Sequence, residues 1–217
     1  MKFPRSIEEA RKVQLELKKK VRLMPLRKQL RIIAGIDAAF TDDRIVAVAC
    51  LFTYPDLKPL EDAHAARKIT FPYVPGFLSF REGPAIIRAA NRLSVRPDLI
   101  LFDGQGIAHP EGLGIASHIG IVLAIPSIGC AKSRLTGEYN EPGAKKGNQS
   151  RLFYKGKAIG KVLRTRDNVK PLFVSPGHMM DIEGAVSIVM QCVGKYRIPE
   201  PIRRADALSK KLKQKIK

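Results

Sequence analysis

Apolar and polar residues alternate along the chain with spacings that indicate both helices and strands. Apolar residues four apart follow the capping pair Ser6 and Glu9, a pattern that predicts an amphipathic helix over residues 7–23. Three strand-like stretches come next, at residues 32–40, 45–53 and about 60–70. Because short links join these stretches, they predict an antiparallel meander.

The rest of the chain predicts strands and helices in alternation. A segment at 71–81 rich in aromatic residues, Pro and Gly predicts irregular structure, and a helix opened by Glu82-Gly83-Pro84 follows and runs to about residue 93. The remaining predicted elements are a strand at 99–102, a helix at 115–124, a strand at 127–131, a hairpin through residue 166, a strand at 172–175 and helices from about 181 and 203. This order predicts an α/β fold with a mixed central sheet flanked by helices.

Length and composition indicate one globular domain spanning residues 1–217. The chain is 45% hydrophobic and 27% charged, which suits a single enclosed core. No apolar run approaches the roughly 18 to 20 residues that a membrane span needs, and the N-terminus lacks the apolar stretch of a signal peptide. A cytoplasmic protein is therefore expected. The sequence does not report the oligomeric state, for which a monomer is favoured. The widely separated Cys50, Cys130 and Cys192 have apolar neighbours and are predicted to be buried free thiols.

The charge balance favours a polyanionic partner. Lys and Arg number 39 and Asp and Glu 20, so the formal net charge is +19. Such an excess attracts polyanions at long range and makes nucleic acid the leading class of partner. Charge alone does not separate DNA, RNA and acidic membranes, and it is also compatible with an ordinary basic surface.

Two aspartates lie where apolar surroundings make a charge costly. Asp37 lies inside an apolar strand, and Asp103 ends the apolar strand at 99–102. Ligand sites in open α/β sheets gather at the carboxyl ends of strands, and Gly104 and Gly106 would let the backbone approach a ligand there. Asp103 is thus a candidate site residue, although an Asp in an Asp-Gly pair also commonly caps a turn.

The carboxylates of Asp37, Glu82 and Asp103 together indicate a metal site. Glu82 taken alone reads as a helix-capping residue, because the start of a helix favours negative charge. Separated carboxylates on an apolar sheet suit phosphate chemistry only if a divalent cation makes the site electropositive. The sequence lacks the zinc-protease pattern His-Glu-x-x-His and the phosphate-binding pattern Gly-x-x-x-x-Gly-Lys-Ser. Metal-assisted phosphodiester hydrolysis with Mg²⁺, for which Mn²⁺ could substitute, is the chemistry that fits.

Five longer motifs resemble the endonuclease V family, in family order and over nearly the whole chain. They are Phe71-Pro72-Tyr73-Val74-Pro75-Gly76-Phe77-Leu78-Ser79-Phe80-Arg81-Glu82, Phe102-Asp103-Gly104-Gln105-Gly106-Ile107-Ala108-His109-Pro110, Ile128-Gly129-Cys130-Ala131-Lys132-Ser133-Arg134-Leu135, Val174-Ser175-Pro176-Gly177-His178 and Tyr196-Arg197-Ile198-Pro199-Glu200-Pro201. The resemblance implies a ribonuclease-H-like fold and a repair enzyme that hydrolyses the second phosphodiester bond 3′ to inosine or deoxyinosine. The expected products carry 3′-hydroxyl and 5′-phosphate ends.

The resemblance also implies roles for individual residues. The implied metal ligands are Asp37, Glu82, Asp103 and, where some members carry His, Asp206. Asp206 also reads as an N-terminal acid of the last helix. Lys132 is implied to contact the phosphate at the cut, and Tyr73 to lie in the wedge that separates the strands. His109 could orient water or phosphate. The pocket for the altered base is expected to be formed by Pro75, Gly76, Leu78 and Gly104. A lone His is equally often a structural hydrogen-bonding residue, the reading preferred for His178, while His64 and His118 are assigned no role.

Two rival readings and one departure from the family pattern remain. Another ribonuclease-H-like nuclease, such as a junction resolvase, would share the carboxylates but not the wedge motif. A non-catalytic nucleic-acid-binding protein would use the charge alone. Many family members carry Arg after the His-Pro pair, whereas this chain has Glu111-Gly112, so a phosphate contact is in doubt there. Lys145 and Lys146 are candidates to contact the nucleic-acid backbone instead. The choice between DNA and RNA depends on groove contacts and stays open.

Overall fold

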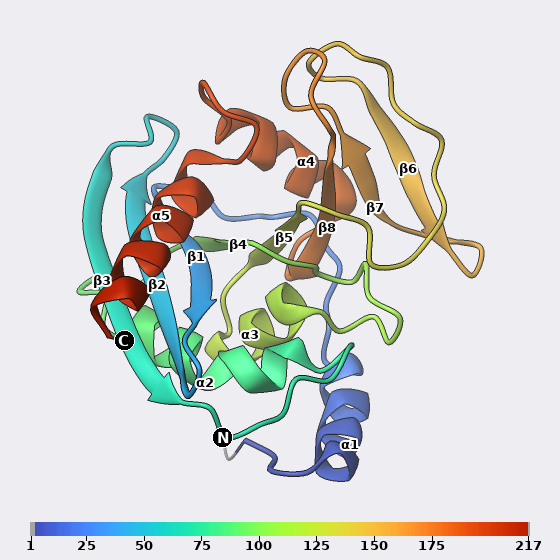
Figure 1. The fold of residues 1–217 in the computed structure, drawn as a ribbon. Coiled ribbons are helices and arrows are strands. Elements are labelled where there is room, and N and C mark those ends of the chain that lie inside the picture. Colours follow the sequence, from blue (N-terminus) through green and yellow to red (C-terminus); the bar gives the residue numbers. More distant parts are fainter. Residues whose placement is uncertain (1–2, 217) are drawn as a thin grey trace.

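A single eight-stranded mixed sheet lies at the centre of the computed structural model, which describes residues 3–216 (Figure 1). The strands are β1 (Ile32–Phe40), β2 (Arg44–Thr53), β3 (Pro59–Lys68), β4 (Leu99–Phe102), β5 (Ser127–Ala131), β6 (Gln149–Tyr154), β7 (Lys157–Leu163) and β8 (Leu172–His178). The helices are α1 (Ile7–Lys18), α2 (Leu78–Ala90), α3 (Ile115–Leu123), α4 (Ile182–Gln191) and α5 (Glu200–Lys215). The predicted α/β class with a helix-flanked mixed sheet is confirmed.

The order of the strands is β3-β2-β1-β4-β5-β8-β7-β6. The first three strands form the predicted antiparallel meander. The strands β1, β4 and β5 run parallel to one another, so their carboxyl ends meet at one edge. The strands β8, β7 and β6 complete the sheet with antiparallel pairing. The parallel centre is the part of the sheet where a ligand site is expected.

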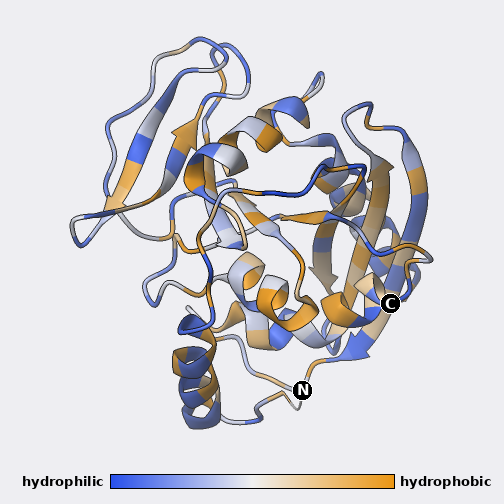
Figure 2. Ribbon diagram, turned by 180° about the vertical axis from the view of Figure 1, so that it is seen from behind, coloured by the Kyte–Doolittle hydropathy of each residue, from blue (hydrophilic) through white to orange (hydrophobic). Residues whose placement is uncertain are grey.

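Helices cover both faces of the sheet because its central strands are apolar on both sides. On β1, Ile33 belongs to the core cluster shared with α4 and α5. Its neighbour Ala34 belongs to the cluster shared with α2 and α3. This alternation is the period of two that a strand imposes on its side chains. Figure 2 shows the central strands as largely hydrophobic and α1, outside these layers, as largely hydrophilic.

Most strand boundaries agree with the predictions, and most disagreements concern helix ends. The first helix stops at Lys18 rather than at residue 23, and Val21 instead packs against the cluster around Ile107. The second helix begins at Leu78, so the prediction of irregular structure through residue 81 is wrong there. Phe80 is fully buried against other aromatic rings, and this tertiary packing outweighs the helix-start signal of Pro84, which lies inside the helix.

Two further boundaries change the setting of candidate residues. The last helix begins at Glu200 rather than at about residue 203, so Asp206 lies in its second turn and is not an N-terminal acid. The strand β8 continues to His178 rather than ending at residue 175 as predicted, so His178 is the last residue of a strand. The Nδ1 atom of His178 accepts a hydrogen bond from the Arg22 backbone N–H, at 3.3 Å, in keeping with the structural role expected of it.

The three cysteines are free and buried, as predicted. Burial raises the pKa of Cys192 to about 12 and that of Cys130 well above its usual value. Thiols in this state act as small apolar core groups. Among residues 3–216, none of the helices combines the length and apolar character that crossing a membrane requires.

Candidate active site

Parallel pairing brings the candidate acids and the candidate lysine to one edge of the sheet. Ile36 of β1 stands beside Phe102 of β4, so the residues that follow them, Asp37 and Asp103, are neighbours. The backbone N–H of Asp103 also contacts the Ile36 carbonyl, at 3.3 Å. Lys132 follows the carboxyl end of β5, the next parallel strand. All three side chains therefore start from the edge where open α/β sheets bind ligands.

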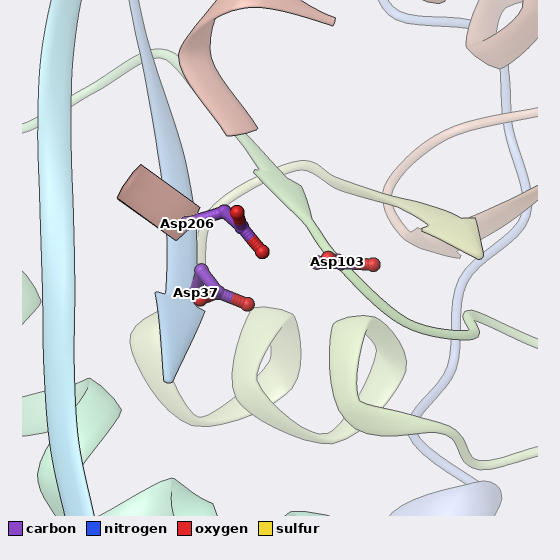
Figure 3. A group of neighbouring side chains, drawn as sticks. All are labelled: Asp37, Asp103 and Asp206. Atoms are coloured by element: carbon purple, nitrogen blue, oxygen red, sulfur yellow. The ribbon is translucent and has the colours of Figure 1, made fainter. Parts of the chain in front are cut away.

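A third carboxylate reaches this edge from α5. Asp37, Asp103 and Asp206 each offer one oxygen, and these three oxygens lie within 4.8 Å of one another. Figure 3 shows the side chains of Asp37 and Asp206 extending from β1 and α5 toward the space beside Asp103. The helix comes this close because Gly35 has no side chain: a Cβ there would stand 2.1 Å from the Pro201 backbone carbon.

Burial and repulsion between neighbouring carboxylates raise the pKa values of two acids at this edge. Burial raises the pKa of Asp37 to about 6, with further increases from the charges of Asp103 and Asp206. The Ser209 hydroxyl donates a hydrogen bond to Asp37 Oδ2, at 2.6 Å, and acts in the opposite direction. Glu82 lies outside this set of three, yet burial, assisted by the charges of Asp37 and Asp103, raises its pKa to about 8. Its position inside α2 removes the helix-capping interpretation.

Two lysines supply positive charge to the cluster. The Lys132 ammonium forms ion pairs with Asp103 and with Asp206, the latter at 3.3 Å. Lys210, one turn along α5, pairs with the other oxygen of Asp206 at 2.6 Å. Burial acts to raise the pKa of Asp206, but these hydrogen bonds and charges outweigh it and hold that pKa below its usual value. The bridging position of Lys132 marks a point where positive charge is favoured.

The donor set fits a divalent metal ion. Three carboxylates converge within reach of one ion, and the raised pKa of Asp37 shows that its charge is poorly compensated by protein groups alone. Hard oxygen ligands of this kind suit Mg²⁺ and Mn²⁺ better than soft metals. The cluster of Asp37, Asp103 and Asp206 could therefore hold a metal ion.

A cavity of about 410 Å³ adjoins the acids. One wall is the aromatic-rich segment before α2 together with the first turn of that helix, and the other is formed by loops after β4 and β5. The lining residues include Tyr73, Val74, Pro75, Gly76, Leu78, Ser79, Asp103, Gly104, Gln105, His109, Lys132 and Ser133. Asp103 thus belongs to both the cavity and the acid cluster, and Lys132 lines the cavity while pairing with two acids of the cluster.

The cavity wall offers backbone donors as well as apolar surface. The residue before α2, Phe77, makes no side-chain cap, so the first-turn amides of Leu78 and Ser79 receive no acceptor from it. Tyr73 is 71% exposed at the rim of the cavity, where its ring is accessible. A flat base could enter with its polar edge toward the amides and its faces against apolar groups.

His109 lies in the cavity wall and is not among the three residues of the acid cluster. Its Nδ1 accepts a hydrogen bond from the Glu111 N–H, at 3.1 Å, and its Nε2 is directed toward Gly76. Burial lowers the pKa of His109, although the Gly76 backbone acts to raise it. This placement resembles the structural alternative for His109 more closely than the orientation of water beside the acids.

Comparisons with known proteins identify the family. The family model for endonuclease V matches residues 15–207 of the chain. An endonuclease V of Geotalea uraniireducens is 49% identical over 210 residues, covering 97% of this chain and 90% of the relative. The chain belongs to the endonuclease V family.

Solved endonuclease V structures have the same fold. That of Streptomyces avermitilis matches with a TM-score of 0.94 and 39% identity, covering 99% of this chain and 96% of the other. That of Ciona intestinalis, in complex with a 24mer DNA containing an inosine followed by a ribo-adenosine, matches with a TM-score of 0.86 and 29% identity, covering 97% and 99%. The prediction of a ribonuclease-H-like nuclease fold is confirmed, and as a family member the protein is a nuclease.

Sequence reasoning overlooked several residues around the endonuclease V site. Ser209 was not singled out, although its spacing of three from Asp206 places both on one side of α5. Arg197 donates to the backbone carbonyls of Lys132 and Pro171, at 2.9 and 2.6 Å, and so ties the loop after β5 to the segment before β8. Arg197 belongs to the last of the five family motifs, but the sequence gives this residue no role of its own. Gln14 lies on the predicted first helix, to which the sequence assigns no role at the site.

Proposed function

We propose that this protein is a metal-dependent endonuclease of deoxyinosine repair, cutting the second phosphodiester bond 3′ to inosine or deoxyinosine and leaving 3′-hydroxyl and 5′-phosphate ends. The observation that carries the proposal is that Asp103 of the acid cluster and its ion-pair partner Lys132 both line the cavity of about 410 Å³. A strand whose base enters the cavity therefore passes close to the metal-binding acids. The Ciona intestinalis relative, with its inosine-containing DNA, supports this class of substrate.

The cavity has the chemistry to select a deaminated purine. Deamination replaces the donor amino group of adenine with an acceptor carbonyl. The first-turn amides of α2, with Leu78 foremost, are donors that would pair with this carbonyl, while adenine would bring a second donor against them. Gly76, Pro75 and Gly104 complete the wall. The base must leave its stack to enter, and a weakly paired lesion does so at lower cost.

The proposed roles of the side chains follow from their positions. Asp37, Asp103 and Asp206 would hold Mg²⁺, with Glu82 as a nearby fourth acid; a bound Mg²⁺ supplies polarisation of the scissile phosphate and a more acidic attacking water. Lys132 would then counter the charge that develops on the phosphate. Tyr73 would stack in the gap that the withdrawn base leaves.

Two alternatives make different demands on the same surface. A junction nuclease would use the acids but would not need a base-sized cavity beside them. A non-catalytic binding protein would need neither. The cavity and the cluster together favour the lesion-reading enzyme. We further propose that residues 1–217 form one domain, which acts as a cytoplasmic monomer.

The decisive experiment uses DNA and RNA oligonucleotides with a single inosine at a known position. Labelled strands are incubated with the protein, with Mg²⁺, with Mn²⁺ or with a chelator, and the product lengths and ends are determined. Strands with adenosine at the same position serve as the control. Cutting at the second bond 3′ to inosine, only with metal and not in the control, is the expected result. Equal cutting of both strands, or cutting of branched DNA alone, would reject lesion recognition.

A further inference from the structure

Helix α1 lies outside the layers of the sheet and packs on the wall of the cavity. Its buried residues are Ala10, Gln14 and Leu17. Ala10 belongs to the same core cluster as Phe71, Phe77 and Phe80, the aromatic rings on both sides of the segment that forms the wall. In Figure 1 this helix stands at the periphery, away from the strands. Its packing therefore serves the wall of the cavity rather than the sheet.

Gln14 is the polar member of this buried face, with only 2% of its surface exposed. Its Nε2 donates a hydrogen bond of 3.0 Å to the backbone carbonyl of Gly76, which is 62 residues away in sequence. The ring of His109 lies against the same glycine, with Nε2 3.7 Å from the position that a Cβ would occupy. A buried amide donor pointing at a single carbonyl of the cavity wall is a specific contact, because leaving either group unpaired is costly.

The peptide group between Gly76 and Phe77 is held at both ends. Gln14 binds its carbonyl, and its N–H donates to the Val74 carbonyl at 3.0 Å. Gly76 has φ of +83°, a conformation that residues with a Cβ rarely adopt. The turn is therefore defined by Gly76 together with these two hydrogen bonds. Immediately after it come Leu78 and Ser79, whose amides open α2 at the cavity.

We propose that Gln14 is a positioning residue that fixes this turn, so that the first-turn amides of α2 face a bound base. The inference rests on the proposed function, because it concerns the same cavity. Without the Gln14 contact, the Gly76 carbonyl loses its buried amide donor and keeps only the His109 ring beside it, and rotation of the peptide between Gly76 and Phe77 displaces the start of α2. The base would then be bound less tightly and read less accurately, while the acids on β1, β4 and α5 would stay in place.

The test replaces Gln14 with Met, which keeps the length and packing of the side chain and removes the donor. Hydrogen exchange of the backbone amides of residues 71–80 is measured together with kcat and KM on inosine and adenosine strands. We expect faster exchange in this segment, a KM for inosine strands about fivefold higher and kcat changed less than about twofold, as the loss of one hydrogen bond predicts. Gln14→Glu, which keeps the shape but presents a carboxylate to the carbonyl, should show a larger effect of the same kind.

Leu17→Ala is the matched control, because it removes buried packing from the same helix and leaves the hydrogen bond from Gln14 to Gly76 in place. It should lower the melting temperature, speed the exchange of 71–80 no more than the lost global stability predicts, and leave the inosine preference unchanged. If Gln14→Met lowers only the melting temperature, or behaves like the control, the positioning role is rejected. Failure of the wild-type protein to cut inosine strands would reject the proposed function instead, and the exchange measurement, which needs no activity, would still decide whether Gln14 orders the turn.

Discussion

Asp37 and Glu82 are carboxyl groups that the fold places where their charged forms are disfavoured, with pKa values of about 6 and about 8. Burial is the main cause for both, and neighbouring acids add to it. Buried carboxyl groups destabilise the fold relative to apolar side chains of similar size, and strongly shifted pKa values cluster at functional sites. A divalent ion reverses this balance by favouring the charged forms.

We predict that Asp103→Asn and Asp37→Asn each abolish cutting while inosine strands still bind, because metal chemistry is lost but the basic contacts remain. Cleavage rates and strand affinities by fluorescence anisotropy test this. Mg²⁺ should also raise the melting temperature of the wild-type protein and not that of the variants. Asp62→Asn is the control, since Asp62 pairs with Arg204 of α5 outside the cluster. A variant that keeps Mg²⁺-dependent cutting would exclude its acid as a ligand.

Tyr73 tests whether the cavity reads a base. We predict that Tyr73→Ala weakens binding of inosine strands by about tenfold or more, because aromatic stacking on a base contributes roughly 1 to 3 kcal/mol. Tyr73→Phe should lose much less, since it keeps the ring. Phe153→Ala, which removes an exposed aromatic ring of β6 outside the cavity, should have little effect. Equal losses for inosine and undamaged strands would show that Tyr73 is an ordinary surface residue.

Among the elements, the buried strands were predictable and the helix ends were not. The strands β1, β4 and β5 have the predicted bounds. A central strand that is buried on both faces gives a near-continuous apolar run, which is easily delimited by the polar links on either side. The start of α2 depends on Phe80 packing against Phe71 and Phe77, and this tertiary contact is invisible to local patterns. The prediction placed Glu82 at the start of the helix, whereas the structure buries it inside α2, where burial raises its pKa to about 8.

The packing of α3 on α2 gives a prediction about pH. His118 of α3 is buried, and its Nδ1 lies 2.9 Å from the Ser79 hydroxyl of α2. Burial lowers its pKa to about 4. Between pH 6.5 and 4 the unfolded chain therefore binds a proton that the folded protein excludes, so the free energy of unfolding should fall as the pH falls, by about 3 kcal/mol from this residue.

The His118→Gln variant isolates this contribution, because an amide can still bond to Ser79 but does not titrate. Urea unfolding from pH 7.5 to 4 should show a shallower loss of stability in the variant than in the wild-type protein. Asp37 and Glu82, whose raised pKa values act in the opposite direction, are present in both proteins and cancel in the difference. Parallel stability curves would mean that His118 binds its proton over the same pH range in the folded and unfolded protein.

At the scale of the whole molecule, the fold class and the family followed from the sequence, but the arrangement of the site did not. The motif order indicated endonuclease V, and the apolar setting of Asp37 and Asp103 indicated a site. Asp206 joins them because α5 crosses β1 closely at Gly35, and α1 packs on the cavity wall, where Gln14 donates to Gly76. Both depend on contacts between residues more than sixty positions apart, which composition and periodicity do not report.

The net charge of +19 leads to the last prediction, which separates general attraction from base reading. Affinity for an inosine strand should fall steeply with salt, because each phosphate that the protein neutralises releases counterions. The ratio of inosine to adenosine affinity should hardly change, because the cavity selects the base through uncharged groups. Replacing Lys145 and Lys146 with Ala, in the loop before β6, should reduce the slope of log K against log salt by about 1.4 on single strands if both contact phosphates.

Lys28→Ala is the control for this double variant, because Lys28 pairs with Asp98 at the amino end of β4, opposite the acid cluster. It should leave the slope unchanged. A slope that the Lys145 and Lys146 replacements do not alter would place the strand elsewhere on the surface. An inosine preference that disappears with rising salt would show instead that selection depends on charge, and the assignment of base reading to the amides of α2 would then be wrong.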